Sequence, residues 1–287
     1  MIIIDMNQVM ISNLMAQLKK DELNESLVRH MVLKSLVAYE RQYKEEYGEV
    51  VLAYDSKHYW RKDFFPYYKY NRKKDRKSSG LDWHSIFDVL NKIRDEIKQY
   101  FPYKVMEVLG AEADDVISVL CRNKKPKEKI LILSGDKDFI QLHKYPGVYQ
   151  YNPIMKSYIT SDNPYTFIKE HIIKGDKSDG IPNFLSDDDT FVSEKRQKPI
   201  SQKKLNMWVD QDPAMFCKTK AEIDNYYRNR TLIDLDYVPL DLEFKILNEF
   251  NDLNTIDKQI PLEYFQKNQL NDLIEVFYFR SSSPFKK

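Results

Sequence analysis

Short apolar runs followed by acidic residues are the feature that most constrains how this chain can fold. Such runs, without alternating polar positions, are typical of strands buried on both faces of a parallel sheet. The runs and their acids are Ile2 to Ile4 with Asp5, Val50 to Tyr54 with Asp55, and Ile130 to Leu133 with Asp136 and Asp138, and a weaker fourth run covers Val105 to Leu109. We therefore expect a parallel sheet in the first half of the chain.

Helical patterns fill the gaps between these runs. Residues 25–47 carry spaced apolar positions and stop at Gly48, and residues 82–101 form an apolar stripe between a capping Asp82 and Pro102. Alternating strands and helices predict an α/β fold, with a mainly parallel central sheet flanked by helices. Residues 149–152 and 158–160 predict a small hairpin at the edge of this sheet.

Strand signals fade after about Asp162, and helical patterns take over. A helix is expected at 165–174 and an exposed loop at 186–198, where the residues are charged and without period. Further helices are expected at 202–209, 220–229, 242–251 and 261–279. We predict an α/β domain over residues 1–161, with a basic segment at about 57–80, and a helical region over residues 162–287.

Composition excludes several other classes of protein. Only seven glycines occur in 287 residues, without a G-x-G-x-x-G or Walker pattern, so nucleotide-binding folds are excluded. Cys121 and Cys217 form no Cys-x-x-Cys pair, which argues against a thiolate zinc site or a disulfide framework. No apolar run approaches the roughly 20 residues of a membrane span, and Met1 to Asp5 is too short for a signal peptide. We expect no membrane association and a location in the cytoplasm.

Nine carboxylates are predicted to meet at one edge of the sheet, because the carboxyl ends of parallel strands share one side. They are Asp5, Asp55, Glu112, Asp114, Asp115, Asp136, Asp138, Asp176 and Asp179. Repulsion between so many charges would raise their pKa values unless cations lie among them. Carboxylate oxygens suit Mg²⁺ and Mn²⁺, so we predict a site for two Mg²⁺ ions, for which Mn²⁺ would substitute. The histidines at positions 30, 58, 84, 143 and 171 form no spaced metal-binding set.

Each of these acids also has a simpler explanation when it is taken alone. An aspartate after a strand is common in turns and at helix N-caps, and the acids at 112–115 would suit the first turn of a helix. Capping does not explain why all of them fall at one end of one sheet. The metal site is therefore the hypothesis that we favour.

A basic segment rich in aromatic residues follows Asp55. Residues 59–77 hold eight lysines or arginines and seven aromatics, a combination that grips single-stranded nucleic acid through phosphate contacts and base stacking. The alternative is a solvated charged linker, although linkers rarely carry this many aromatics. The predicted nucleic-acid contacts in this segment are Arg61, Lys62, Tyr67, Lys69, Arg72, Lys73, Lys74, Arg76 and Lys77.

The acidic motifs occur in the order and approximate spacing of a known family. The motifs Ile-Ile-Ile-Asp5, Tyr54-Asp55, Glu112-x-Asp114-Asp115, Gly135-Asp136-x-Asp138 and Gly175-Asp176-x-x-Asp179 resemble those of the flap endonuclease and 5′-nuclease superfamily. The segments 59–69, 226–228 and 232–239 look most like those of the ribonucleases H of T4-type bacteriophages, which are 5′-to-3′ exonucleases.

The resemblance implies a PIN-like 5′-nuclease fold and a metal-dependent 5′-to-3′ nuclease with flap endonuclease activity. Such an enzyme removes RNA primers and short DNA from the 5′ ends of lagging-strand fragments and leaves 5′ phosphates. By matching position, one ion would be held by Asp5, Asp55 and Asp114, with Glu112 acting through water, and the second by Asp115, Asp136, Asp138 and Asp179, with Asp176 beside them. Lys69 and Arg72 fall in the family's basic arch, and the resemblance assigns them the neutralisation of charge on the scissile phosphate.

The resemblance breaks after Gly180-Ile181-Pro182. The family there carries a glycine-bearing hairpin that holds duplex, whereas residues 183–189 are acidic and lack glycine. Duplex binding is therefore expected to depend on Lys195, Arg196, Lys198, Lys203 and Lys204. The expected partners are RNA–DNA hybrids, nicked or flapped duplex DNA and a replication single-strand-binding protein, for a monomer in the host cytoplasm if phage-encoded.

Three other functions are compatible with parts of the pattern. An aspartyl phosphohydrolase would need a second acid two residues after Asp5, where the chain has Asn7. A PIN-type ribonuclease shares the sheet but usually lacks the arch and the helical second half. The third alternative is a catalytically silent nucleic-acid-binding replication accessory protein, which would not need an intact acid in every motif.

Overall fold

The sheet at the centre of the molecule has six strands, in the order β3-β2-β1-β4-β5-β6. The computed structural model describes residues 1–18, 22–253, 258 and 260–278. The strands are β1 (Ile2–Asp5), β2 (Val50–Ala53), β3 (Lys104–Met106), β4 (Ile130–Leu133), β5 (Val148–Asn152) and β6 (Ser157–Ile159). All neighbouring strands pair in parallel except β5 and β6, which form an antiparallel hairpin at the edge.

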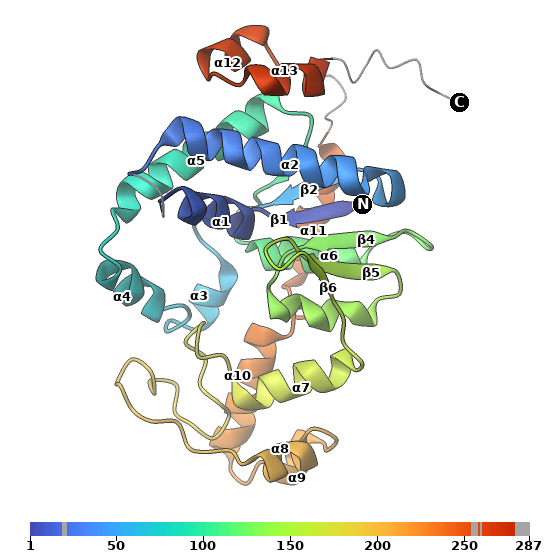
Figure 1. Ribbon diagram of the computed structural model, residues 1–287. Helices are drawn as coiled ribbons and strands as arrows, with labels where there is room; N and C mark the ends of the chain where they lie inside the picture. The colour runs from blue at the N-terminus through green and yellow to red at the C-terminus, as the bar shows by residue number, and fades with distance from the viewer. Residues whose placement is uncertain (19–21, 254–257, 259, 279–287) are drawn as a thin grey trace.

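Helices cover both faces of the sheet and continue beyond it (Figure 1). Around the sheet lie α1 (Met6–Leu18), α2 (Glu25–Tyr47), α5 (Trp83–Tyr100), α6 (Ala113–Arg122), the 3-10 helix η1 (Lys137–Lys144) and α11 (Leu240–Asp252). The basic segment contains the short helices α3 (Trp60–Phe64) and α4 (Asn71–Ser78). The remaining helices are α7 (Pro164–Lys174), α8 (Gln202–Trp208), α9 (Pro213–Phe216), α10 (Lys220–Ile233), α12 (Leu262–Lys267) and α13 (Asn271–Tyr278).

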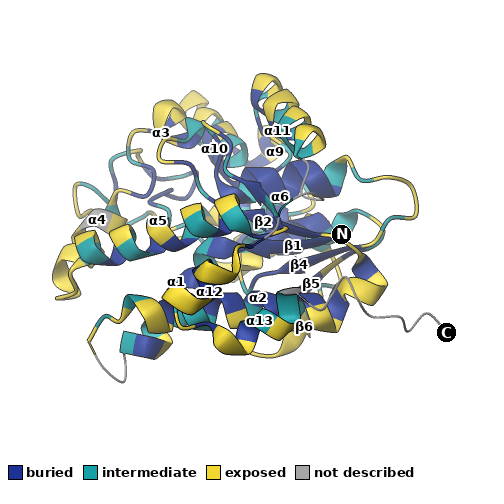
Figure 2. Cartoon of the chain, turned by 90° about the horizontal axis from the view of Figure 1, so that it is seen from above, coloured by how far each residue is buried: buried dark blue, intermediate teal, exposed yellow. Residues whose placement is uncertain are grey.

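The two faces of the sheet are buried in separate apolar cores, since successive side chains of a strand point to opposite faces. Ile2 and Ile4 pack in one core with α1, α2 and α5, whereas Ile3 packs in the other with α6 and α11. Figure 2 shows the consequence, with buried strands in the middle and exposed residues along the outer sides of the helices. Burial on both faces explains why the strands read as unbroken apolar runs.

The register of the strands brings the acidic segments to one edge. Asp5 lies opposite Ala53 of β2, and Ile4 lies opposite Leu133 of β4. Ser134, which follows β4 directly, therefore leaves the sheet level with Asp5, and Asp55 follows two residues after Ala53. This edge is where the candidate site is built.

A third apolar core joins the basic segment to the helical second half of the chain. Phe65 and Tyr68 pack in one cluster with Ile172 of α7, Phe184 and Trp208 of α8. Phe184 and Trp208 meet edge to face, with ring centroids 5.4 Å apart. The base of the basic segment is thus held by tertiary packing.

The structure confirms the α/β architecture and most of the predicted elements, including the helices at 25–47 and 82–101 and the edge hairpin. The single helix predicted at 261–279 is wrong, because α12 and α13 are separate and Gln269 between them has a φ of 57°. The chain turns there so that Leu270 can be fully buried. Position 279, the predicted end, lies outside the described residues.

Two further expectations concern the environment of the protein. Among the helices that the structure describes, none has the length and apolarity that a membrane span requires. Cys121 and Cys217 are both buried free thiols. The predicted boundary between residues 161 and 162 stays a prediction.

We expect Ile132→Ala to lower the free energy of unfolding by about 2–5 kcal/mol, because its side chain is fully buried in the central strand β4 and truncation leaves a cavity. Chemical denaturation monitored by circular dichroism measures this loss. The matched control is Ile154→Ala, at a position that is 59% exposed, where a change within about 0.5 kcal/mol is expected. Equal effects of the two substitutions would contradict the proposed core.

Candidate metal centre and nucleic-acid interface

Asp5 anchors the acidic edge from the last position of β1. Its carboxylate accepts hydrogen bonds from the hydroxyl of Ser134 at 2.9 Å and from the backbone N–H of Gln8 at 3.2 Å. Burial raises the pKa of Asp5 from 3.8 to about 6, and the negative charges of Asp55 and Asp136 act in the same direction. Asp5, Asp55 and Asp136, which follow three different strands, therefore lie close enough for their charges to affect the pKa of Asp5.

Asp55 and Asp114 extend this group. The Asp55 carboxylate accepts a hydrogen bond from the backbone N–H of Ala113 at 2.8 Å, which ties the end of β2 to the start of α6. Burial raises the pKa of Asp114 far above its usual range, and the charges of Asp136, Glu112 and Asp55 add to this effect. Lys69 opposes the shift for both Asp55 and Asp114. We define Asp5, Asp55, Asp114 and Asp136 as the first acidic group.

Asp138, Asp176 and Asp179 form a second acidic group beside the first. Burial and the charge of Asp136 raise the pKa of Asp138 to about 7, and Asp176 and Asp179 add to the rise. Asp176 is held by the backbone N–H and the hydroxyl of Ser178, each at 2.7 Å. Although its desolvation acts to raise the pKa of Asp176, the hydrogen bonds from His171 and Ser178 hold it below its usual range.

Asp115 and Arg61 pair with each other inside the protein. Asp115 is fully buried, and its carboxylate accepts hydrogen bonds from Arg61 at 2.7 Å, from the Trp60 indole at 3.2 Å and from the backbone N–H of Glu112 at 2.9 Å. Arg61, predicted to contact nucleic acid, is 1% exposed and also donates to Glu112 at 3.0 Å. Asp115 thus forms a fully buried ion pair with Arg61, and its predicted role as a metal ligand stays a prediction. The same ion pair gives Arg61 an internal role.

Lys69 and Arg72 bring positive charge to the acids. The Lys69 ammonium lies 2.5 Å from Glu112 and 3.8 Å from Asp179, and the Arg72 guanidinium donates to Asp179 at 2.8 Å. The hydroxyl of Tyr68 donates to Asp179 at 3.0 Å. Desolvation acts to lower the pKa of Lys69, but Asp179 and Glu112 outweigh it and raise the pKa, so Lys69 stays charged. Glu112 is fully buried and forms ion pairs with Lys69 and Arg61.

Gly180 allows the basic segment to approach the second acidic group. The backbone N–H of Lys69 donates to the carbonyl of Asp179 at 2.7 Å. A Cβ at Gly180 would lie only 2.8 Å from the carbonyl oxygen of Tyr67, and its φ is +75°. A glycine is therefore required for this contact, on both steric and conformational grounds.

His171 joins the second acidic group, although its spacing in the sequence indicated no metal site. Its Nε2 lies 3.2 Å from Asp176, and its Nδ1 lies 3.4 Å from Asp138. Desolvation acts to lower the pKa of His171, but Asp176 and Asp138 outweigh it and raise the pKa. The available signal was His171 lying five residues before Asp176 at the end of a predicted helix.

The other predicted nucleic-acid contacts lie outside the acidic groups. Exposed basic residues are Lys62, Lys74, Arg76 and Lys77 in the basic segment and Lys195, Arg196, Lys198, Lys203 and Lys204 further along the chain. Tyr67 is half-buried, and the side chain of Lys73 is outside the described part of the structure. The predicted exposed loop at 186–198 contains no helix or strand, but Ser186 and Thr190 within it are buried. Asp188 in this loop pairs with Arg228 of α10.

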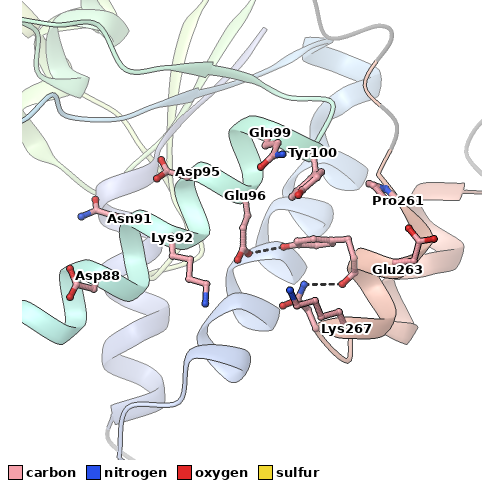
Figure 3. Close-up of a pocket in the computed structure, with 12 residues that line it drawn as sticks. Asp88, Asn91, Lys92, Asp95, Glu96, Gln99, Tyr100, Pro261, Glu263 and Lys267 are labelled. Atoms are coloured by element: carbon pink, nitrogen blue, oxygen red, sulfur yellow. Dashed lines mark hydrogen bonds between the residues drawn. The ribbon is translucent and has the colours of Figure 1, made fainter.

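The second acidic group, with Asp114 and Asp136 of the first, lines a cleft of about 550 Å³ together with Lys69, Arg72 and His171. Asp5 and Asp55 are not part of this lining and act on Asp114 or Asp136 through their charge. A larger groove of about 750 Å³ lies between α5 and α12, and its lining includes Lys92, Glu96, Glu263 and Lys267. Figure 3 shows Glu96 of α5 directed toward α12. Glu96 in that groove already accepts hydrogen bonds from Arg29 at 2.6 Å and Tyr264 at 2.8 Å. The groove mixes both signs of charge, whereas the cleft concentrates acids, so the cleft is the better candidate site.

The donors in the cleft fit divalent cations. Among the described residues, no hydrogen bond is donated to the Asp114 carboxylate, which is partly buried. The negative charges of Asp136, Glu112 and Asp55 act on this carboxylate. One oxygen each of Asp138 and Asp176 and one ring nitrogen of His171 lie within 4.8 Å of one another. Crowded carboxylates with raised pKa values are the arrangement that a hard cation relieves.

Comparisons with known proteins bear on this site. Residues 1–171 match the family described as 5′-3′ exonuclease, N-terminal resolvase-like domain, and residues 164–278 match the family described as T4 RNase H, C terminal. Over 282 residues, the chain is 35% identical to the ribonuclease H of Enterobacteria phage T4, covering 94% of this chain and 92% of that protein.

Solved structures share the fold. A bacteriophage T5 protein co-crystallised with metal ions superposes with a TM-score of 0.64 at 16% identity, over 87% of this chain and 98% of its own. The T5 flap endonuclease in a complex with DNA and metal ions superposes with a TM-score of 0.55 at 17% identity, over 87% of this chain and 97% of its own.

We expect Asp5→Asn to stabilise the ion-free protein above pH 6, by up to about 3 kcal/mol. The folded-state pKa of about 6 lies above the ordinary 3.8, so the folded protein binds the extra proton between these values and stability falls as pH rises through them. The asparagine keeps the shape and removes the charge. Thermal unfolding in chelator from pH 4 to pH 8 measures the difference, which should vanish near pH 4. A variant that is less stable than the wild type at pH 7.5 would contradict this account.

Proposed function

The chain belongs to the 5′-3′ exonuclease family with a T4-type ribonuclease H C-terminal domain, and we propose that it removes RNA primers and short DNA from the 5′ ends of lagging-strand fragments. Family membership makes it a metal-dependent 5′-3′ nuclease, a hydrolase with exonuclease and flap endonuclease activity. The single observation that carries the proposal is that acids from the end of β4, the start of α6 and the turn after α7 share one cleft with Lys69 and Arg72 of the basic segment.

We assign the acids to two Mg²⁺ ions by their neighbours. Asp5, Asp55 and Asp114 would hold one ion, because their charges act on one another and they surround the end of β1. Asp138 and Asp179 would hold the other, with Asp176 beside them. Asp136 of the first group would join them, because its charge acts on Asp138 as well as on Asp5. Glu112, which is fully buried beside this group, would position the first ion through a water molecule. When bound, two such ions lower the pKa of an attacking water and stabilise the departing 3′ oxygen.

The basic segment would receive the 5′ strand. Lys69 is buried among the acids, and Arg72, at the rim, is 45% exposed, so both would face the phosphate that enters the cleft. Their charge would offset the charge that develops on the scissile phosphate. The exposed cations of α4 would grip the strand beyond the cleft through its phosphates.

The proposed substrates are RNA–DNA hybrids and nicked or flapped duplexes. The T5 flap endonuclease, which shares this fold and was solved in a complex with DNA and metal ions, supports a nucleic-acid substrate. Lys195, Arg196, Lys198, Lys203 and Lys204 are the proposed contacts with the duplex. A monomeric state, a single-strand-binding protein as partner, and the cytoplasm as location stay predictions.

Asp114→Asn is expected to abolish Mg²⁺-dependent cleavage of a 5′-labelled RNA–DNA hybrid while leaving substrate affinity within about threefold, because it removes a ligand and no contact with nucleic acid. Gel assays with Mg²⁺ and with chelator measure cleavage, and fluorescence anisotropy measures binding. Asp75→Asn, at an exposed carboxylate on α4, is the control and should cleave normally. Unchanged cleavage by Asp114→Asn would contradict the metal assignment. Cleavage of the hybrid in chelator by the wild type would contradict the metal-dependent function itself.

Replacing Lys69 and Arg72 together with Ala is expected to slow single-turnover cleavage at least tenfold, about 1.4 kcal/mol in barrier. The physical reason is the loss of two cations beside the reacting phosphate. Lys245→Ala, at an exposed position on α11, is the control for loss of a surface charge. Thermal unfolding checks that the double variant folds, since Glu112 loses its ion pair with Lys69. A wild-type rate for the folded double variant would contradict the catalytic role of Lys69 and Arg72 and would favour the alternative that the basic segment is a charged linker.

A further inference from the structure

His171 sits where two acids from different parts of the chain converge. It lies near the end of α7, Asp138 is in the first turn of η1, and Asp176 follows α7 by two residues. The imidazole places one nitrogen toward each carboxylate, with Nε2 at 3.2 Å from Asp176 and Nδ1 at 3.4 Å from Asp138. The ring itself is positioned by an edge-to-face contact with Phe167, at 6.0 Å between centroids.

The two ring nitrogens are not equivalent. Nε2 has hydrogen-bond geometry with Asp176, whereas Nδ1 is inaccessible to solvent and has no hydrogen-bond partner among the described residues. A buried nitrogen left without a partner costs about 1–3 kcal/mol, so such atoms call for an explanation. With the proton on Nε2, the Nδ1 lone pair points to the side of Asp138.

This pattern is the usual environment of a histidine that binds metal. Such a histidine donates its second ring N–H to a carboxylate, which holds the ring and its tautomer in place. Asp176 is suited to that role, because Ser178 and the backbone N–H of Asp179 fix the Asp176 carboxylate in turn. A carboxylate oxygen of Asp138 lies on the other side of the ring, 3.4 Å from Nδ1.

We propose that Nδ1 of His171, together with the Asp138 carboxylate, binds a divalent transition-metal ion such as Mn²⁺, with Asp176 orienting the imidazole. The proposal rests on the metal-dependent nuclease function and identifies a nitrogen ligand within its second acidic group. Imidazole binds transition metals in preference to Mg²⁺, which favours ligands made only of oxygen. His171 thereby biases this position toward Mn²⁺ over Mg²⁺.

The test is pulsed electron paramagnetic resonance of the Mn²⁺-loaded protein, which detects the ¹⁴N coupling of a directly bound imidazole. The wild type should show this coupling, and His171→Gln should lose it. The matched control is His30→Gln, because His30 also pairs with an aspartate, Asp272 at 2.9 Å, and lies away from the cleft. Unfolding curves in chelator establish that both variants fold.

Calorimetric titration supplies a second readout. His171→Gln should weaken Mn²⁺ binding at one site by about tenfold or more and change Mg²⁺ affinity by less than about threefold. Absence of ¹⁴N coupling in a wild type that binds Mn²⁺ and cleaves the hybrid would overturn the role of His171 and leave the nuclease function standing. A wild type that binds no divalent ion and cleaves nothing would overturn both.

Discussion

Repulsion between carboxylates is the constraint on which the rest of this structure depends. Acids from β1, β2, β4 and the turn after α7 converge so closely that burial and mutual charge raise the pKa values of Asp5, Asp114 and Asp138. Without cations such a group disfavours the folded state. The protein supplies positive charge through Lys69, which is buried among the acids, and through Arg72 at the rim, and the proposed metal ions would supply the remainder.

The same charges couple the basic segment to the acidic edge. Tyr68, Lys69 and Arg72 all reach Asp179 or Glu112, and the close approach at Gly180 joins the two backbones. Phe65 and Tyr68 add an apolar anchor in the core shared with α7 and α8. A strand held by the basic segment would therefore be presented to the acids by elements that are already packed together.

Most of the architecture could be predicted because it depends on local patterns. Unbroken apolar runs follow from strands buried on both faces, and the stripe of α5 follows from one buried helix face. The break between α12 and α13 was not predicted, because no glycine or proline marks it in the sequence. The chain turns there where Leu270 is buried in the core. The internal place of Arg61 could not be predicted for a similar reason, since a cation in a basic segment is expected at the surface and only the fold shows that Arg61 pairs with Asp115 inside.

The sequence by itself determined that acids would gather at one edge of a parallel sheet beside a cationic, aromatic segment, because strand direction and register leave the carboxyl ends no other place to meet. Only the tertiary structure decided which partner each acid takes. That choice depends on partners distant in the chain: Arg61 takes up Asp115, Lys69 pairs with Glu112, and His171 enters between Asp138 and Asp176. Electrostatic pairing acts through space over a few ångströms, and the spacing of residues along a chain does not encode those distances.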